Sequence, residues 1–182
     1  MLFVILAIVV VLALYFVSTQ RKFISFDEIN QNALSQIGVQ QNARWNALSQ
    51  LVNAARSYAE IEKETLSEIV SQRVPITMDS TAEQVNQQEN VLSQAMSRLI
   101  AVAENYPELK ASGLYEKAMD SINTYENDVR MSKMVFNDTV TKWNRLVRQF
   151  PSSIVAGILG FSSKTYLETP EEKQAYPDLQ FK

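Results

Sequence analysis

The first candidates for chemistry in this sequence are carboxylates, because histidine and cysteine are both absent from its 182 residues. Without histidine the chain lacks the commonest general base and the commonest transition-metal ligand, and without cysteine it has neither thiol chemistry nor disulfides. Helical bundles can hold paired metals, but their usual ligands are Glu residues combined with Glu-x-x-His motifs. A site made of carboxylates alone would have to draw on Glu60, Glu62, Glu64, Glu104, Glu126 and Asp128.

Two of these carboxylates adjoin apolar helical stripes. Glu62 falls on the stripe of the first long helical segment, and Glu126 follows the stripe position Tyr125. Each could serve as a buried acid, and the competing interpretation is a buried hydrogen bond or ion pair with an arginine. We favour the ion pair, so the sequence predicts no enzymatic activity, no metal and no cofactor.

Composition favours an all-α protein that binds neither nucleic acid nor an evident small-molecule substrate. Four Gly and five Pro are too few to supply the turns of a many-stranded fold. The net charge is -3 and the Lys and Arg residues are scattered, so the sequence shows no basic patch that would bind nucleic acid. The predicted fold is an N-terminal transmembrane helix followed by a long antiparallel helical bundle of three to four helices. We expect an anchor over 1–20, the bundle over 21–161 and an irregular C-terminal tail over 162–182.

The N-terminal segment predicts a single membrane span. Every residue from 2 to 17 is apolar or aromatic, and this run makes a helix about 24 Å long. Adding residues 1, 18 and 19 brings it close to the roughly 30 Å of a bilayer core. A cleaved signal peptide is the competing interpretation, against which there is no basic n-region and no small-x-small cleavage site. Arg21 and Lys22 follow the span and place the bundle in the cytoplasm by the positive-inside rule, with the opposite side left open.

The first bundle helix is expected to run to Arg73 and to carry an amide-rich half. Gly38 is its only glycine and should weaken or kink it by about 1 kcal/mol relative to Ala. The amide-rich half is either a solvated or inter-helix polar face, which we favour, or a surface that pairs with a second subunit or a partner helix. The residues of this candidate partner face are Gln36, Gln40, Gln41, Arg44 and Asn46.

Prolines and caps divide the rest of the bundle. Ser80 and Glu83 form an S-x-x-E capping box that predicts a helix from about 81 to 105, with Ser112 as the N-cap of a third helix. That third helix has an aromatic-rich stripe that we interpret as core, interrupted by Lys133, and it ends at Pro151.

Of the remaining segments, the turn between the last two long helices is a candidate contact site, although we favour its interpretation as a structural corner. Exposed turns often carry binding residues, and the candidate residues in this turn are Tyr106, Pro107, Glu108 and Lys110. The segment 151–161 is too short to span a bilayer, so it either caps the bundle or dips into a membrane surface. The tail from 162 is expected to be an extended strap or partly disordered.

Three stretches carry the most specific motifs of the sequence, at 35–73, 101–112 and 125–161. The motifs are Tyr106-Pro107-x-Leu109-Lys110, the pair Glu126-Asn127, then Asn137 and Asn144, and Phe150-Pro151 before Ala156-Gly157-x-x-Gly160-Phe161. Over roughly 35–181, with the N-terminal segment, the chain resembles the bacterial LemA family. It departs from the family pattern at Gly38, where Asp is usual, and at 42–50, where a Lys-Arg-Arg run and Asp-Leu-Ile-Pro-Asn are usual, so this polar surface is less charged.

The resemblance implies a single-pass protein of the bacterial inner membrane with a long antiparallel bundle and no established reaction. One magnetosome-associated branch of the family suggests a link to membrane organisation. The polar residues of the motifs are expected to be structural, with Arg73 paired to a carboxylate and Asn127 and Asn137 satisfying buried polar groups. This structural set is Arg73, Glu126, Asn127, Asn137 and Asn144.

Three classes of function follow. We favour a non-enzymatic membrane-anchored scaffold or adaptor that binds protein partners or forms a homo-oligomer. A helical sensor that relays a signal is the alternative, and it would need a ligand cavity that a close-packed aromatic seam leaves little room for. A carboxylate-metal enzyme is the third and least favoured.

Overall fold

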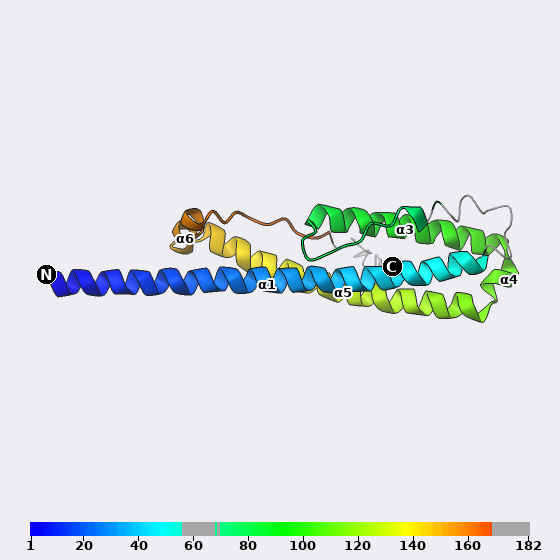
Figure 1. Ribbon diagram of the computed structural model, residues 1–182, viewed down its shortest axis with the longest axis horizontal. Coiled ribbons are helices and arrows are strands. Elements are labelled where there is room, and N and C mark those ends of the chain that lie inside the picture. The colour runs from blue at the N-terminus through cyan, green and yellow to red at the C-terminus, as the bar shows by residue number, and fades with distance from the viewer. Residues whose placement is uncertain (56–67, 69, 169–182) are drawn as a thin grey trace, which may run out of the picture.

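The computed structural model describes residues 1–55, 68 and 70–168, and this part of the chain is helical with no strand. Its helices assemble into a long rod (Figure 1), as the sequence predicts for an all-α bundle. The helices are α1 (Leu2–Ala55), α3 (Ala82–Asn105), α4 (Pro107–Lys110), α5 (Gly113–Arg148) and α6 (Ser152–Leu159).

Helix α1 runs without interruption from the apolar N-terminal segment into the bundle. Its 54 residues correspond to a length of about 81 Å. The first part stands alone in Figure 1, and the rest packs side by side with α5, which runs in the opposite direction. Helix α3 runs in the same direction as α1, because the extended segment before it carries the chain back along the rod.

Gly38 lies inside α1 for a steric reason. The helix continues through it, and the residue is buried against the returning segment. A Cβ atom at this position would collide with the backbone carbonyl oxygen of Ile76. Glycine therefore permits a close approach of two backbones here.

The helix starts are set by side-chain caps. A capping box opens α3, but it is formed by Thr81 and Gln84, one residue beyond the predicted pair. Ser80 instead accepts a hydrogen bond from the backbone N–H of Thr77. The predicted N-cap of α5 is confirmed, since Ser112 Oγ accepts from the backbone N–H of Tyr115 at 3.2 Å.

The turn predicted between α3 and α5 contains one helical turn of its own. Pro107 occupies the first position of α4, where a missing N–H costs nothing. Leu109 of α4 is fully buried in the core shared by α1, α3 and α5. Its side chain thereby fixes the corner at the far end of the rod.

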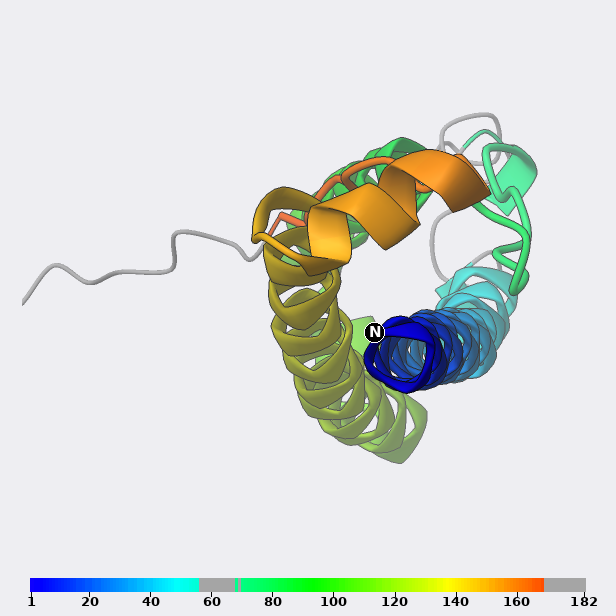
Figure 2. The ribbon, with the colours of Figure 1, turned by 90° about the vertical axis from the view of Figure 1, so that its left-hand side faces the viewer.

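The end nearest the apolar segment has its own aromatic core. Figure 2 looks along the rod from this end and shows α6 lying across it. Phe23 of α1 contacts Trp143 of α5 edge-on, with ring centroids 4.9 Å apart, and Phe161 packs against both rings at tilted angles of 45° and 58°. The α5 stripe is core here as predicted, whereas Phe150 at its end is 75% exposed.

After α6 the chain returns along α5 as an extended segment, 162–168, which we term the strap. Asn144 donates to the carbonyl of Lys164 and accepts from its N–H, and Asn137 makes the same pair with Leu167, at 2.8–2.9 Å. The two asparagines are seven residues apart, about 10.5 Å along a helix, which matches the roughly 10 Å of three extended residues. The predicted strap therefore has a defined path, and the rest of the predicted tail, 169–182, lies outside the described residues.

Candidate partner-binding groove

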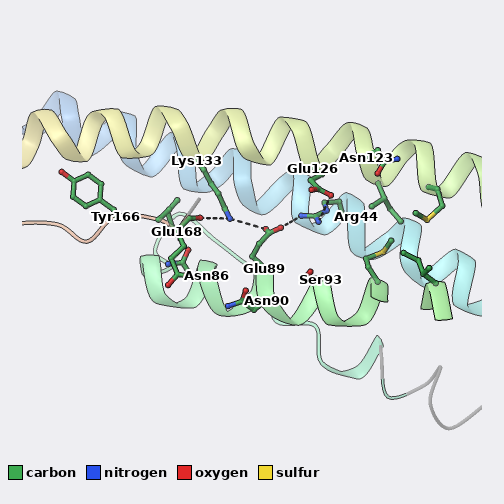
Figure 3. A pocket seen from close by; sticks show the side chains of 15 residues that line it. Arg44, Asn86, Glu89, Asn90, Ser93, Asn123, Glu126, Lys133, Tyr166 and Glu168 are labelled. Carbon is green, nitrogen blue, oxygen red and sulfur yellow. Dashed lines mark hydrogen bonds and ion pairs between the residues drawn. The ribbon is translucent and has the colours of Figure 1, made fainter. Parts of the chain in front are cut away.

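A groove of about 890 Å³ opens along the rod between α3 and α5, with α1 as its floor. Figure 3 shows side chains from all three helices and the strap pointing into it. One end is apolar, and the other is lined by amides, a phenol and the last strap residue. The apolar lining comprises Met96, Ile100, Met119 and Ile122, and the polar end comprises Asn86, Asn90, Tyr166 and Glu168.

The floor of the groove carries a charged cluster centred on Glu89 of α3. Arg44 of α1 donates from Nη1 to Glu89 Oε1 at 2.6 Å, and Gln41 donates from Nε2 to Oε2 at 2.9 Å. Lys133 of α5 places Nζ 3.8 Å from Oε2 and also donates to the strap carbonyl of Glu168 at 3.3 Å. We call Arg44, Glu89 and Lys133 the charged floor, and it links three helices and the strap.

Burial makes the charges of this cluster interdependent. Arg44 and Lys133 are each only 3% exposed. Burial alone would raise the pKa of Glu89, but the charges of Arg44 and Lys133 and the hydrogen bonds it accepts outweigh this and lower it. Burial lowers the pKa of Lys133, and the charge of Glu89 only partly offsets that effect. Glu89 is thus well compensated, whereas the Lys133 ammonium is not.

The cluster is also incompletely hydrogen-bonded. Arg44 Nε is buried and has no partner among the described residues. A second carboxylate, Glu126, lies 3.6 Å from Arg44 Nη2 but is half exposed at the groove mouth. A buried donor without a partner costs stability. The side chains of Asn30 and Trp45 also have buried polar atoms without a partner among the described residues.

The predicted partner face is split by the structure. Gln36 and Asn46 are exposed and Gln40 is half-buried, as such a face requires. Gln41 and Arg44 are buried at 2% and 3% exposure, so their assignment to the partner face is wrong, and the favoured interpretation of an inter-helix polar face holds for these two residues. They turn inward because Glu89 offers a charged acceptor on the neighbouring helix.

Arg73 binds amides where a carboxylate was predicted. Its guanidinium donates to Asn42 Oδ1 and Asn46 Oδ1, each at 3.0 Å. These amides lie on α1, so the side chain ties the returning segment to that helix. The amide-rich composition of α1 explains the substitution of partner, since amide oxygens are the acceptors within reach.

The other predicted polar residues fall into two groups. Asn137 and Asn144 hold the strap, and Asn144 is 5% exposed. Asn127 is exposed and, among the described residues, bonds within α5 to Asn123 and Arg130, so the prediction that it satisfies a buried polar group is wrong. The less favoured possibility that Glu126 is a buried acid is wrong, because its side chain is exposed. The favoured pairing with an arginine is observed, at 3.6 Å from Arg44 Nη2, although it lies at the groove mouth and not in the core.

The carboxylates considered for a metal site do not converge in the described part of the chain. No three of its acidic residues lie close enough together to hold a metal ion. Glu60, Glu62 and Glu64 lie outside the described residues. The predicted absence of an enzymatic activity therefore stays a prediction.

The corner at α4 keeps its exposed residues. Pro107, Glu108 and Lys110 are exposed and Tyr106 is half-buried, while Leu109 between them is core. The surface is accessible at the far end of the rod, and its use as a contact site stays a prediction.

Glu89 is the site residue that sequence reasoning missed. Its signal was a seven-residue gap in the apolar stripe of α3, between Val85 and Leu92, which Gln88 and Glu89 fill. Lys133 interrupts the stripe of α5 in the same way. Two charged interruptions of opposite sign on helices of one bundle are candidates to meet in the core.

Comparison with known proteins supplies a family and no closer relative. The family model described as the LemA family matches residues 33–181, most of the chain. No curated protein sequence matches significantly.

Proposed function

Because this chain belongs to the LemA family and its α1 is long and apolar enough to cross a membrane, we propose that it is a non-enzymatic, membrane-anchored scaffold that binds a protein partner in the groove between α3 and α5. The proposal covers the anchor, the partner and the lack of catalysis together.

The groove is the observation that carries this proposal. It is open along the rod, so an elongated segment of another protein can enter from the side. Met96 and Met119 line its apolar end, and methionine side chains adapt to different apolar partners. The half-exposed carboxylate of Glu126 at the groove mouth is available to polar groups of the same segment. An amphipathic helix or extended peptide combines these two requirements.

The continuity of α1 supports the scaffold part of the proposal. The helix leaves the apolar segment near Thr19 and continues to Ala55 without a break, a distance of about 55 Å. No flexible linker lies between the two parts, so the groove would be held at a fixed height above the membrane. We place the anchor in the bacterial inner membrane with the bundle in the cytoplasm, on the basis of Arg21 and Lys22 after the span.

Site-specific photo-crosslinking tests the groove in intact cells. A photoreactive amino acid replaces Asn123 in the groove, and matched variants replace Gln36 on the outer face of α1 and Glu108 on α4. We expect one discrete adduct from position 123 and none from position 36. An adduct of twice the chain mass would identify a second copy as the partner. Adducts from position 108 alone would move the site to the corner, and no adduct from any position would contradict the scaffold.

The sensor remains a second candidate because the groove provides a cavity. Its volume of about 890 Å³ falls in the range of small-molecule sites, roughly 300–1,000 Å³. A ligand in the groove should protect Asn123→Cys from alkylation, without protecting Glu108→Cys. Protection by a small-molecule extract, in the absence of any crosslinked protein, would favour the sensor.

A further inference from the structure

Helix α6 carries an apolar face that no described part of the protein covers. Its inner side is buried, with Val155 and Ala156 at 4% and 1% exposure. On its outer side Ile154 and Ile158 are 55% and 68% exposed, and Phe150 just before the helix is 75% exposed. The helix contains no charged residue. Such a face normally has a partner.

The position of α6 in the rod identifies that partner. Helix α6 packs on α1 at the aromatic core of Phe23 and Ala156. The first buried residue of α1 is Thr19, directly before this contact, and everything N-terminal to it is exposed except for half-buried Phe16. Figure 1 shows α6 beside α1 at the point where α1 leaves the bundle. Residues 2–19, about 27 Å of helix, fill a bilayer core, so its boundary falls at the level of α6.

The end of the rod that carries α6 is basic, as contact with an anionic membrane surface requires. Segments 1–26 and 139–164, which build this end, contain no acidic residue, whereas the rest of the chain holds all 20. Six of the 17 Lys and Arg residues lie in the same two segments. Lys142 and Lys164 pair with Asp138 and Asp27 just outside them. For the other four, the described residues supply no ion-pair partner; they are Arg21, Lys22, Arg145 and Arg148.

We propose that α6 is a second membrane attachment: its outer face, with Phe150, lies in the interface of an anionic bilayer, and the four cations contact lipid phosphates. The inference rests on the membrane anchor of the proposed function. An uncharged apolar helix beside a basic ring has the composition of an interfacial element. The rod would then be held at two points, α1 and α6, which fixes its tilt as well as its height.

Fluorescence quenching in vesicles tests this proposal, and the absence of native cysteine makes the labelling specific. Full-length variants Ile158→Cys on α6, Val11→Cys in the span and Glu108→Cys at the far end are each labelled with an environment-sensitive fluorophore. They are reconstituted in phosphatidylcholine vesicles containing phosphatidylglycerol, with nitroxide-bearing lipid as quencher. We expect strong quenching at positions 11 and 158 and none at 108.

The outcomes of this experiment distinguish failure of the α6 attachment from failure of the membrane anchor. Quenching at position 11 without quenching at 158 would overturn the α6 proposal and leave the anchor intact. Loss of quenching at both positions would overturn the anchor and the proposal with it. A blue-shifted but unquenched probe at 158 would mean that protein, such as a second copy, covers the face, and would also overturn it.

Two further variants protect the test. Ile154→Cys places the probe one turn away, so a local disturbance by the label at 158 does not decide the result. In the Ile158→Cys background, Arg145→Gln with Arg148→Gln should reduce quenching in vesicles with phosphatidylglycerol and leave quenching in pure phosphatidylcholine unchanged. Equal quenching of parent and variant in anionic vesicles would contradict the role of the cations.

Discussion

Two regions of the bundle bury polar groups, and they differ in how completely those groups are hydrogen-bonded. The strap is held by the neutral amides of Asn137 and Asn144, and each side chain satisfies one backbone N–H and one carbonyl. The charged floor buries Arg44 and Lys133 around one carboxylate and leaves Arg44 Nε without a partner among the described residues. The hydrogen bonds of the two asparagine side chains are thus complete, whereas those of the charged floor are not.

The difference separates a structural device from a candidate site. Neutral amides in full register add stability at a small desolvation cost, because every polar atom they bury is paired. Buried charges cost more to desolvate than they return unless their hydrogen bonds are complete. The charged floor therefore differs from the strap in that it lies beside the open groove and is not fully hydrogen-bonded among the described residues.

The largest effect is expected when the centre of the charged floor is removed. Glu89→Leu leaves Arg44 and Lys133 buried without their shared carboxylate, so the free energy of unfolding should fall by about 3 kcal/mol. Urea unfolding of the detergent-solubilised protein, followed by circular dichroism, measures this change. The matched control is Glu126→Gln, whose half-exposed carboxylate should matter by less than about 0.5 kcal/mol. Equal losses in the two variants would remove the distinction between the floor and the groove mouth.

Breaking the strap should cost somewhat less. Asn144→Leu removes two hydrogen bonds and leaves the N–H and carbonyl of Lys164 unpaired, so we expect a loss of about 2 kcal/mol. Asn127→Leu, on an exposed face of the same helix, is the matched control and should change stability by less than about 0.5 kcal/mol. Hydrogen exchange at the amide of Lys164 gives a local measure, and it should accelerate in Asn144→Leu alone. Unchanged exchange would show that the strap is held by its other contacts.

Acid should weaken the charged floor and spare the strap. The pKa of Glu89 is lower in the folded protein than its ordinary value of 4.5. Its charge therefore adds stability that is fully present above that value and is lost as pH falls through the folded pKa. Glu89→Gln has no carboxylate to protonate, so it lacks this pH-dependent stabilisation. The difference in the free energy of unfolding between wild type and variant should therefore shrink as pH falls below about 4.5. The effect is smaller than that of Glu89→Leu because a protonated carboxyl still forms hydrogen bonds. A difference independent of pH would mean that Glu89 acts by shape alone.

The sequence predicted the strap better than the charged floor, for a physical reason. Helix ends depend on neighbours within four residues, so Ser112 and Pro107 placed the corner and its cap correctly. The strap asparagines were expected to be structural because they belong to the motifs that carry the family resemblance. The inward direction of Arg44 depends on Glu89, 45 positions later, and amide-rich periodicity in α1 carries no information about that partner. The burial of Gly38 against Ile76 depends in the same way on a returning segment.

Replacing Lys133 should have the smallest effect on the free energy of unfolding. It is also the most direct test of whether the charged floor differs from the strap. Lys133→Met keeps the buried stem and removes an ammonium whose pKa burial has lowered. Glu89 retains Arg44 and Gln41, so the free energy of unfolding should change by less than about 1 kcal/mol. A lysine whose pKa is lowered on folding destabilises the fold at neutral pH, and this cost is relieved as pH rises toward 10.5. Wild type should therefore gain stability relative to Lys133→Met between neutral and alkaline pH in urea titrations. A loss above about 2 kcal/mol would show that Lys133 is a required partner of Glu89, and the charged floor would then be as structural as the strap.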